Sequence, residues 1–284
     1  VGTLIGSASE GSQIRNILIA AKVSGDSRVG GLVGSVSAFT TYIHINNSVI
    51  SGSVVGNAYV GGVVGFAYFL DTQSIYSING VLSTALVEGD RDRDRSVGGL
   101  IGYNDNLTVI DSYWAQDSSQ QLSSAGQSEV NSYVGLSLET LQCAIAADSD
   151  FSAGCVSSDG SAENLTATMV LYRDWDAEIW DFGSSEQLPG LKFNGQVLRD
   201  SDGDGVVDTE DALPNHRAAW QDIDGDGHPG VWSLNCNNAC IAGSGLILDQ
   251  FPDHAWAYLD ADFDGLVDGI NNCSRCRNDS ASGG

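Results

Sequence analysis

A short glycine-rich string recurs four times in the first third of the chain, and it limits the possible folds more than any other feature. Each copy is six residues long, starts with Val-Gly and ends in glycine, as in the second copy, V29-G-G-L-V-G34. The final glycines of the four copies are Gly6, Gly34, Gly65 and Gly102. They are 28, 31 and 37 residues apart. Repetition at a period near 30 residues is typical of a solenoid, in which each period forms one coil.

A second pattern lies between the strings. A polar residue is followed by a run rich in β-branched residues that ends in glycine, and the copies begin at Asn16, Asn47 and Asn79, with a divergent fourth copy at Asp111. We therefore expect an all-β fold: a β-solenoid of about four coils, each supplying two or three short strands. Proline, which removes a ladder donor, is absent before Pro189. A β-sandwich with glycine-rich turns is the alternative, but it does not need a fixed period.

The repeats and the segment after them resemble the GLUG-motif repeats of bacterial and archaeal secreted and surface proteins. Such arrays commonly end in motifs that this chain also has. They are S112-Y-W114, S124-A-G126, W175-D-A-E-I-W180-D-F182 and L188-P-G-L191. The resemblance covers about residues 1–195 and implies solenoid repeats over 1–115 and a cap with a Trp-rich tail over 116–199. The acidic insert 143–165 and the long third repeat depart from the pattern.

The charge of the chain is strongly acidic and uneven. Acidic residues outnumber basic ones 37 to 12, for a formal net charge of −25. The first 99 residues are nearly neutral, at −1, whereas residues 100–199 carry −11 and residues 200–284 carry −13. Nucleic acids and anionic membranes demand a basic face, so neither is an expected partner. The apolar stretch 54–70 is short for a transmembrane helix and fits the repeat better.

The acidic region contains a calcium-loop signature. Residues 200–211 read D-S-D-G-D-G-V-V-D-T-E-D, which fits the D-x-D-x-D-G template with acids also at loop positions 9 and 12. Ca²⁺ takes six to eight oxygen ligands, and carboxylates at alternate loop positions can converge on one ion. The expected ligands are the carboxylates of Asp200, Asp202, Asp204, Asp208 and Asp211 and the carbonyl of Val206.

Two further copies of the loop follow. The second has Asp222, Asp224 and Asp226 but lacks acids at positions 9 and 12. The third has Asp260, Asp262, Asp264, the Leu266 carbonyl and Asp268. These last two loops belong to a 38-residue tandem, in which D211-A-L-P-N-H216 precedes one and D249-Q-F-P-D-H254 precedes the other.

These loops, with cysteines between them, resemble thrombospondin type 3 calcium repeats over about residues 200–276. The resemblance implies that residues 200–284 form an irregular, disulfide-tied region that folds around Ca²⁺. The alternative is a solvated acidic linker, but closely packed carboxylates repel one another without a counterion.

All six cysteines lie in the acidic part of the chain. Cys143 and Cys155 are expected to form a local bridge. The pairing of Cys236, Cys240, Cys273 and Cys276 stays open between local and crossed bridges, and four such thiolates could in principle bind zinc. The calcium signature favours disulfides, because it indicates an extracellular setting.

The third repeat contains the insert D90-R-D-R-D-R95. It is either a solvated, self-neutralising protrusion or a surface on which Arg91, Arg93 and Arg95 meet an acidic neighbour. Because the sequence also starts inside a repeat string, we expect head-to-tail self-assembly into a homo-oligomer or filament.

No motif for a catalytic nucleophile or acid–base pair is evident, so we do not expect an enzyme. A glycosidase pair involving Asp174 or Glu178 stays a remote alternative. The prediction is a secreted, calcium-binding structural protein of a prokaryotic cell surface or matrix. The alternatives are a calcium-dependent adhesin or carbohydrate-binding module, with Trp232 or Trp256 exposed to a polysaccharide, and the non-catalytic part of a larger secreted hydrolase.

Overall fold

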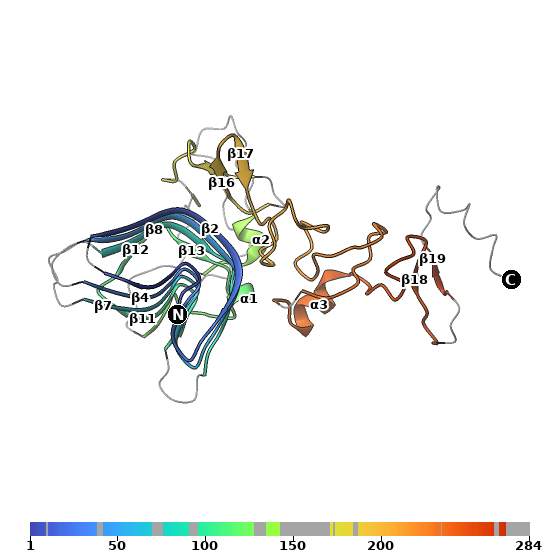
Figure 1. The fold of residues 1–284 in the computed structure, drawn as a ribbon, viewed down its shortest axis with the longest axis horizontal. Coiled ribbons are helices and arrows are strands. Elements are labelled where there is room, and N and C mark those ends of the chain that lie inside the picture. Colours follow the sequence, from blue (N-terminus) through green and yellow to red (C-terminus); the bar gives the residue numbers. More distant parts are fainter. Residues whose placement is uncertain are drawn as a thin grey trace. The chain divides into compact units, whose positions relative to one another are not determined.

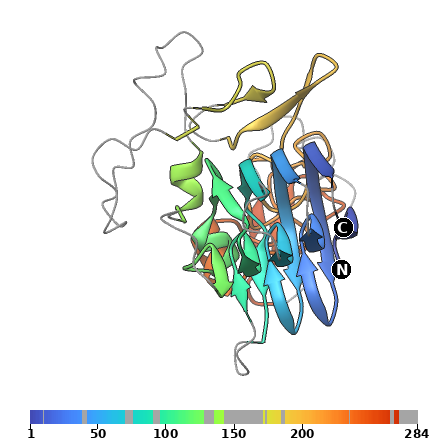
Figure 2. The ribbon, with the colours of Figure 1, turned by 90° about the vertical axis from the view of Figure 1, so that its left-hand side faces the viewer.

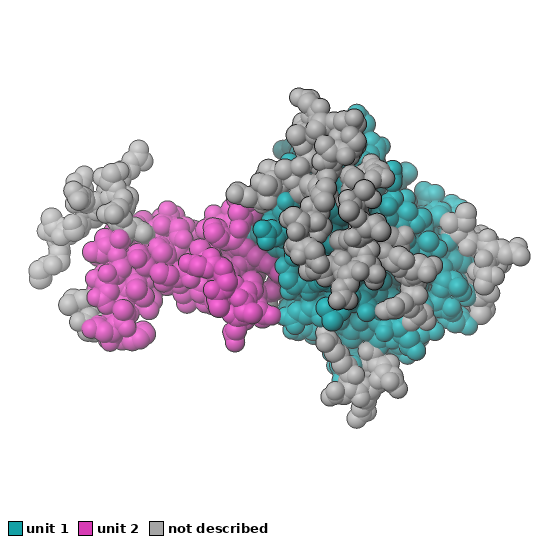
Figure 3. All heavy atoms as spheres, turned by 180° about the vertical axis from the view of Figure 1, so that it is seen from behind, with its two compact units in different colours: residues 1–207 teal, residues 208–284 magenta. Residues whose placement is uncertain are grey.

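The computed structural model divides the chain into two compact units, residues 1–207 and 208–284 (Figure 3). It describes residues 1–270 apart from ten gaps, at 10, 39–41, 70–75, 91–95, 128–134, 143–170, 173, 184–186, 234 and 264–266.

The first unit is built on parallel strands that repeat in groups of three along the chain. The first group is β2 (Ser12–Ser24), β3 (Ser27–Gly30) and β4 (Val33–Ala38). The second is β5 (Ile43–Val55), β6 (Ala58–Gly61) and β7 (Val64–Phe69). The third is β8 (Tyr76–Ser83) with β9 (Leu86–Glu88), then β10 (Val97–Gly98) and β11 (Ile101–Asp105). Flanking strands are β1 (Ile5–Ala8), β12 (Thr108–Ile110), β13 (Tyr113–Trp114) and β14 (Ala125–Gln127).

Equivalent strands of successive groups pair in parallel and form three sheets. Their orders are β1-β4-β7-β11-β14, β10-β6-β3 and β12-β8-β5-β2, with β13 on β8 and β9 on β5. Figure 1 shows the chain winding round the three sheets, and Figure 2 shows the strands stacked side by side. This is a β-solenoid, as the 30-residue period predicts.

The solenoid makes about three turns rather than the four expected. Four glycine strings enclose only three intervals, and each interval supplies one full set of strands. The first string contributes a short edge instead: β1 pairs with β4, and Gly2 forms an isolated bridge to Gly30.

The glycines of the string are required by the close approach of neighbouring coils. A Cβ on Gly31 would lie 2.6 Å from the Ile50 methyl and still closer to the Gly62 carbonyl oxygen. A Cβ on Gly65 would lie 2.5 Å from the Arg28 carbonyl carbon of the preceding coil. These contacts involve backbone or the packed core, which cannot move away cheaply. Only glycine therefore fits at these positions between neighbouring coils.

The polar position between strings marks a corner with a left-handed backbone. Asn16, Asn47, Gly80 and Asp111 all have positive φ, between 40° and 62°. Glycine, asparagine and aspartate tolerate this conformation best. In the third copy the corner residue is Gly80 and not Asn79, which pairs in register with Asn46. The expected start of that copy was therefore wrong by one residue.

The interior of the solenoid is filled by aliphatic ladders. Ile14, Ile45 and Ile78 align in register and are at most 6% exposed. Such stacking buries apolar side chains in every coil, and this burial is the main stabilising contribution to the unit.

A second apolar cluster covers the outer side of the same sheet. Leu82 and Tyr113, which point outward from the sheet, pack with Tyr172, Trp175 and Trp180 of the Trp-rich tail. The Trp175 indole donates a hydrogen bond to the Asp111 carbonyl oxygen at 2.8 Å, and Tyr172 donates one to the Leu141 carbonyl oxygen at 2.8 Å. Burial, and secondarily the neighbouring Tyr113, raises the pKa of the Tyr172 hydroxyl well above its usual value. The described part of the tail therefore lies along a lateral face of the solenoid.

The remaining elements are short. In the first unit they are α1 (Gln116–Ser119), α2 (Leu138–Leu141) and an antiparallel sheet of β15 (Trp180–Asp181), β16 (Gly190–Phe193) and β17 (Gln196–Leu198). In the second unit they are α3 (Asn238–Ser244), β18 (Ala257–Leu259) and β19 (Gly269–Ile270).

Among the described residues, no helix has the length and apolar character that crossing a bilayer would require.

Candidate metal sites

The first aspartate loop follows β17 and begins in the solenoid unit. Asp200, Asp202 and Asp204 are each 2% exposed, and each offers a carboxylate oxygen within 4.8 Å of the others. The loop is shaped by bonds from its own backbone: the amides of Gly203 and Gly205 donate to the Asp200 carboxylate at 2.8 and 2.9 Å. The carboxylates are therefore gathered by the turn that the D-x-D-x-D-G sequence forms.

Contacts to the solenoid unit hold this loop in place. The Ser201 carbonyl oxygen accepts hydrogen bonds from the Leu188 amide and from the Gln142 side chain, at 3.2 and 3.0 Å. Gly203 has φ of +72°, and a Cβ there would lie 2.8 Å from the Thr84 side chain. The first aspartate cluster is thus an integral part of the solenoid unit.

The second loop repeats the same turn in the second unit. The Asp222 carboxylate accepts hydrogen bonds from the amides of Gly225 at 2.8 Å, Asp226 at 3.2 Å and Gly227 at 2.8 Å. The ligand oxygens of Asp222, Asp224 and Asp226 lie within 4.8 Å of one another. The two loops thus present matching sets of three carboxylates.

Asp224 differs from its neighbours in the second loop. Both of its carboxylate oxygens are buried, and neither has a hydrogen-bond partner among the described residues. Buried polar atoms in folded proteins almost always have a hydrogen-bond partner or an ion. A cation between the three carboxylates would give both oxygens of Asp224 a partner.

The third cluster is more open. Asp260 is 8% exposed, and oxygens of Asp260, Asp262 and Asp268 lie within 4.8 Å of one another. The Asp268 carboxylate also accepts a hydrogen bond from the Ala261 amide at 2.9 Å, which closes the loop. The expected ligands Asp264 and Leu266 lie outside the described residues.

The tandem seen in the sequence is also a structural tandem. The Asp211 carboxylate accepts from the Leu213 amide at 2.7 Å, and the Asp249 carboxylate accepts from the Phe251 amide at 2.7 Å. Each copy then continues with equivalent backbone bonds: Ala212 amide to Trp220 carbonyl, and Gln250 amide to Tyr258 carbonyl. Residues 211–220 and 249–258 therefore have the same local fold.

Asp249 lies beside the second loop. It is 5% exposed, and its amide donates a hydrogen bond to the Pro229 carbonyl oxygen at 2.8 Å. Burial, followed by the charges of Asp224 and Asp222, raises the pKa of the Asp249 carboxyl, while the Phe251 amide and His228 oppose the rise. Burial likewise raises the pKa of Asp226, with Asp224 and Asp249 adding to it against the His228 amide and side chain. Four carboxylates, from Asp222, Asp224, Asp226 and Asp249, thus share one electrostatic environment.

The predicted ligands at the end of the first loop are divided between the units. Val206 belongs to the solenoid unit, where its amide donates to the Asp204 carboxylate at 2.8 Å, whereas Asp208 and Asp211 belong to the second unit. Asp249 was not among the predicted ligands. Its correspondence with Asp211 in the tandem is the signal that could have singled it out.

No family model, curated protein or solved structure matches this chain. The resemblances to GLUG and thrombospondin type 3 repeats therefore stay predictions, and the three aspartate clusters are the basis for the functional argument.

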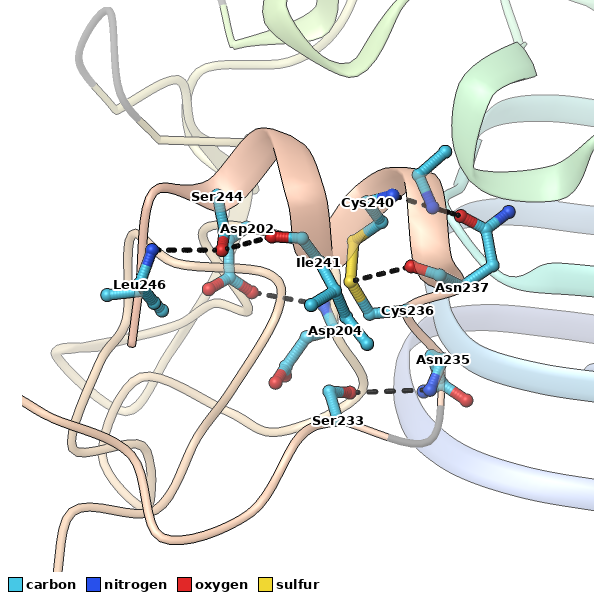
Figure 4. Close-up of a disulfide and its surroundings, with 11 residues drawn as sticks. Asp202, Asp204, Ser233, Asn235, Cys236, Asn237, Cys240, Ile241, Ser244 and Leu246 are labelled. Carbon is cyan, nitrogen blue, oxygen red and sulfur yellow. Dashed lines mark hydrogen bonds between the residues drawn. A yellow bond between two sulfur atoms is a disulfide. The ribbon is translucent and has the colours of Figure 1, made fainter. Parts of the chain in front are cut away.

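One disulfide joins Cys236 and Cys240, whose Cα atoms are 5.3 Å apart (Figure 4). Cys240 lies in α3, which is capped at its start by the Asn237 side chain, an acceptor for the amides of Ala239 and Cys240 at 3.0 Å. This is the local pairing, one of the two left open above. It also removes two of the four thiols that a zinc site would need. Cys143, Cys155, Cys273 and Cys276 lie outside the described residues.

The other candidates that the structure describes are not members of the three clusters. Asp174 and Glu178 are exposed, and Trp232 and Trp256 are partly buried. Arg91, Arg93 and Arg95 lie outside the described residues.

Proposed function

We propose that this chain is a calcium-binding structural protein, in which a β-solenoid scaffold carries a region whose fold depends on Ca²⁺. The observation that carries the proposal is the triple convergence of carboxylates, each set within 4.8 Å, in loops that share one sequence template.

The chemistry of the donors selects the ion. All the side-chain donors are carboxylates, and a hard, oxygen-only shell suits Ca²⁺ or Mg²⁺ rather than Zn²⁺ or Cu²⁺. Flexible loops with many carboxylates favour Ca²⁺, which accepts six to eight ligands, over the strict octahedron of Mg²⁺. The ions would neutralise carboxylates that otherwise repel one another.

Calorimetric titration of the decalcified full chain with Ca²⁺ tests the proposal. We expect several ions to bind, and expect Asp202→Asn and Asp224→Asn each to weaken one of them. The Asp253→Asn variant is a matched control, because Asp253 is an exposed residue of the same region. The proposal would be overturned if the unaltered chain bound no more calcium than the D202N/D224N double variant.

Secretion to a prokaryotic surface or matrix belongs to the same proposal. It is supported by the Cys236–Cys240 disulfide, because disulfides persist in oxidising compartments. Head-to-tail assembly into a filament is the mechanical role we propose for the solenoid. Electron microscopy of the full chain in millimolar calcium tests it: filaments are expected, and monomers alone would contradict it.

A further inference from the structure

The second aspartate loop lacks ligands that a complete calcium loop supplies from its own sequence. The template has acidic residues at positions 9 and 12, and the second loop has Gly230 and Ser233 there. Three carboxylates alone leave a Ca²⁺ ion short of its usual six to eight oxygens. Another part of the chain, or water, must provide the rest.

The tandem identifies which part of the chain does so. In the first loop, the twelfth position is Asp211, which opens the first tandem copy. Asp249 opens the second copy and has the same backbone geometry, with its carboxylate accepting from the amide two residues later. Asp249 therefore holds in the second tandem copy the place that Asp211 holds in the first, and it lies 27 positions after Asp222, whereas Asp211 lies 11 positions after Asp200.

Despite this longer separation along the chain, Asp249 and the second loop lie next to each other in the structure. The Asp249 amide bonds to the Pro229 carbonyl at 2.8 Å, and the His228 ring stacks on Tyr258 with centroids 3.7 Å apart. The His228 Nδ1 atom lies 3.3 Å from the Ile247 carbonyl oxygen. These contacts place the end of the second loop against the start of the second tandem copy. The intervening residues, which include the Cys236–Cys240 disulfide and α3, form an insertion that leaves Asp249 beside the loop.

The Asp224 carboxylate provides the independent sign of a ligand. Both of its oxygens are buried without a hydrogen-bond partner among the described residues, and Asp224 belongs to the cluster whose loop is held to Asp249 by the backbone hydrogen bond at Pro229. We propose that Asp249 is a remote fourth carboxylate ligand of the cation bound by Asp222, Asp224 and Asp226, replacing the acid missing at the twelfth loop position. This inference rests on the proposed calcium function and adds a ligand to it.

The test compares Asp224→Asn, Asp249→Asn, the double variant and Asp253→Asn in the full chain, by calcium calorimetry after decalcification. Asparagine keeps the side-chain oxygen that accepts from the Phe251 amide, so the turn is preserved and only the charge changes. Loss of a residue that only supports a metal ligand typically weakens metal binding by roughly 10–100-fold. We expect D249N to weaken one calcium site by at least as much. The double variant should weaken that site by much less than the product of the two single effects.

A second measurement separates ligation from a structural role. In decalcified protein, D249N removes a repelling charge, so its melting temperature should equal or exceed that of the unaltered chain. In saturating calcium the order should reverse. A residue needed only for folding would lower the melting temperature in both conditions, and that result would overturn the inference.

The remaining outcomes are distinct. If D224N weakens calcium binding while D249N behaves like D253N, Asp249 is not a ligand and the calcium function stands. If the effects of D224N and D249N multiply independently, the two residues do not share an ion and the inference fails. If neither D202N nor D224N changes calcium binding, the proposed function itself fails.

Discussion

At the scale of single residues, the glycines of the repeated string are the least replaceable part of the solenoid. A Cβ on Gly31 would collide with both the backbone and the Ile50 side chain of the next coil. Gly6 occupies the last position of the first string, yet a Cβ there would meet nothing within 4 Å. Gly65 holds the same last position in the third string, and a Cβ there would lie 2.5 Å from the Arg28 carbonyl carbon. The last position of the string therefore carries different constraints in an inner coil and at the edge.

We expect Gly31→Ala to lower the free energy of unfolding by about 1–3 kcal/mol or more, since it overpacks a site bounded by backbone. Gly6→Ala should change it by no more than about 0.5 kcal/mol. Denaturant unfolding followed by circular dichroism measures both. Equal effects of the two variants would contradict the packing explanation.

The second cluster should make stability depend on pH in the absence of calcium. Burial, followed by the charge of Asp224, raises the pKa values of Asp226 and Asp249 above 3.8 in the folded state. Just above pH 3.8 the folded chain retains protons that the unfolded chain has released. The free energy of unfolding therefore falls as pH rises through that interval, and the penalty is fully present above the raised pKa values.

Thermal unfolding of decalcified protein from pH 3.8 upward measures this dependence. Asp249→Asn should flatten the decline, whereas Asp253→Asn should leave it unchanged. Calcium affinity should increase over the same pH interval, because the ion displaces protons. A decalcified protein that becomes steadily more stable with rising pH, with D249N showing the same slope, would contradict the assignment.

At the scale of elements, the outer face of the β12-β8-β5-β2 sheet depends on the Trp-rich tail. Trp175 is 4% exposed and packs against Trp180, with ring centroids 4.1 Å apart. Tyr113 and Tyr172 meet edge to face at 5.3 Å. The tail thus buries apolar side chains that the strands direct away from the interior of the solenoid.

We expect Trp175→Ala to destabilise the first unit by about 3–5 kcal/mol, the usual cost of removing a buried aromatic ring. Trp175→Phe should cost less, because it keeps most of the packing and loses the hydrogen bond to Asp111. Denaturant unfolding, followed by a signal from the first unit, measures the free energy of unfolding of both variants. A cost for W175A below that of W175F would argue against the lateral packing.

Much of this organisation follows from the sequence, and the exceptions have physical causes. The period and the glycines predict the solenoid, because inter-coil pairing requires both. The face covered by the tail is not predictable, since it depends on how Tyr172 and Trp175 fit residues about 60 positions earlier. The role proposed for Asp249 is hidden for a similar reason, because an insertion separates it from the loop it adjoins. At Gly80 and Asn79, two adjacent residues both suit a left-handed corner, so only the pairing register decides between them.

At the scale of the whole molecule, calcium should affect both units. The first cluster belongs to residues 1–207 and the other two to residues 208–284. Metal binding stabilises a fold when the unfolded chain cannot bind the ion as well. Removal of calcium should therefore loosen residues 208–270 and also the segment that packs near Thr84, while the inner strands stay paired.

Hydrogen exchange with and without a chelator tests this expectation peptide by peptide. We expect lost protection over 200–207 and 208–270 and retained protection over β5 and β8. Asp202→Asn should reproduce only the loss at 200–207. Unchanged exchange, melting temperature and protease resistance after calcium removal would contradict it.

The uniform register between coils also makes the length of this scaffold a countable quantity. Ile14 pairs with Ile45 and Ile45 with Ile78, so excising the coil between them would bring equivalent residues together again. Each added or deleted period changes the stack by one strand spacing, about 4.8 Å, without disturbing the coils beyond it. A gene that gains or loses one repeat thus adjusts a molecular spacer in fixed increments, while the flanking elements and the metal-binding loops keep their own structures.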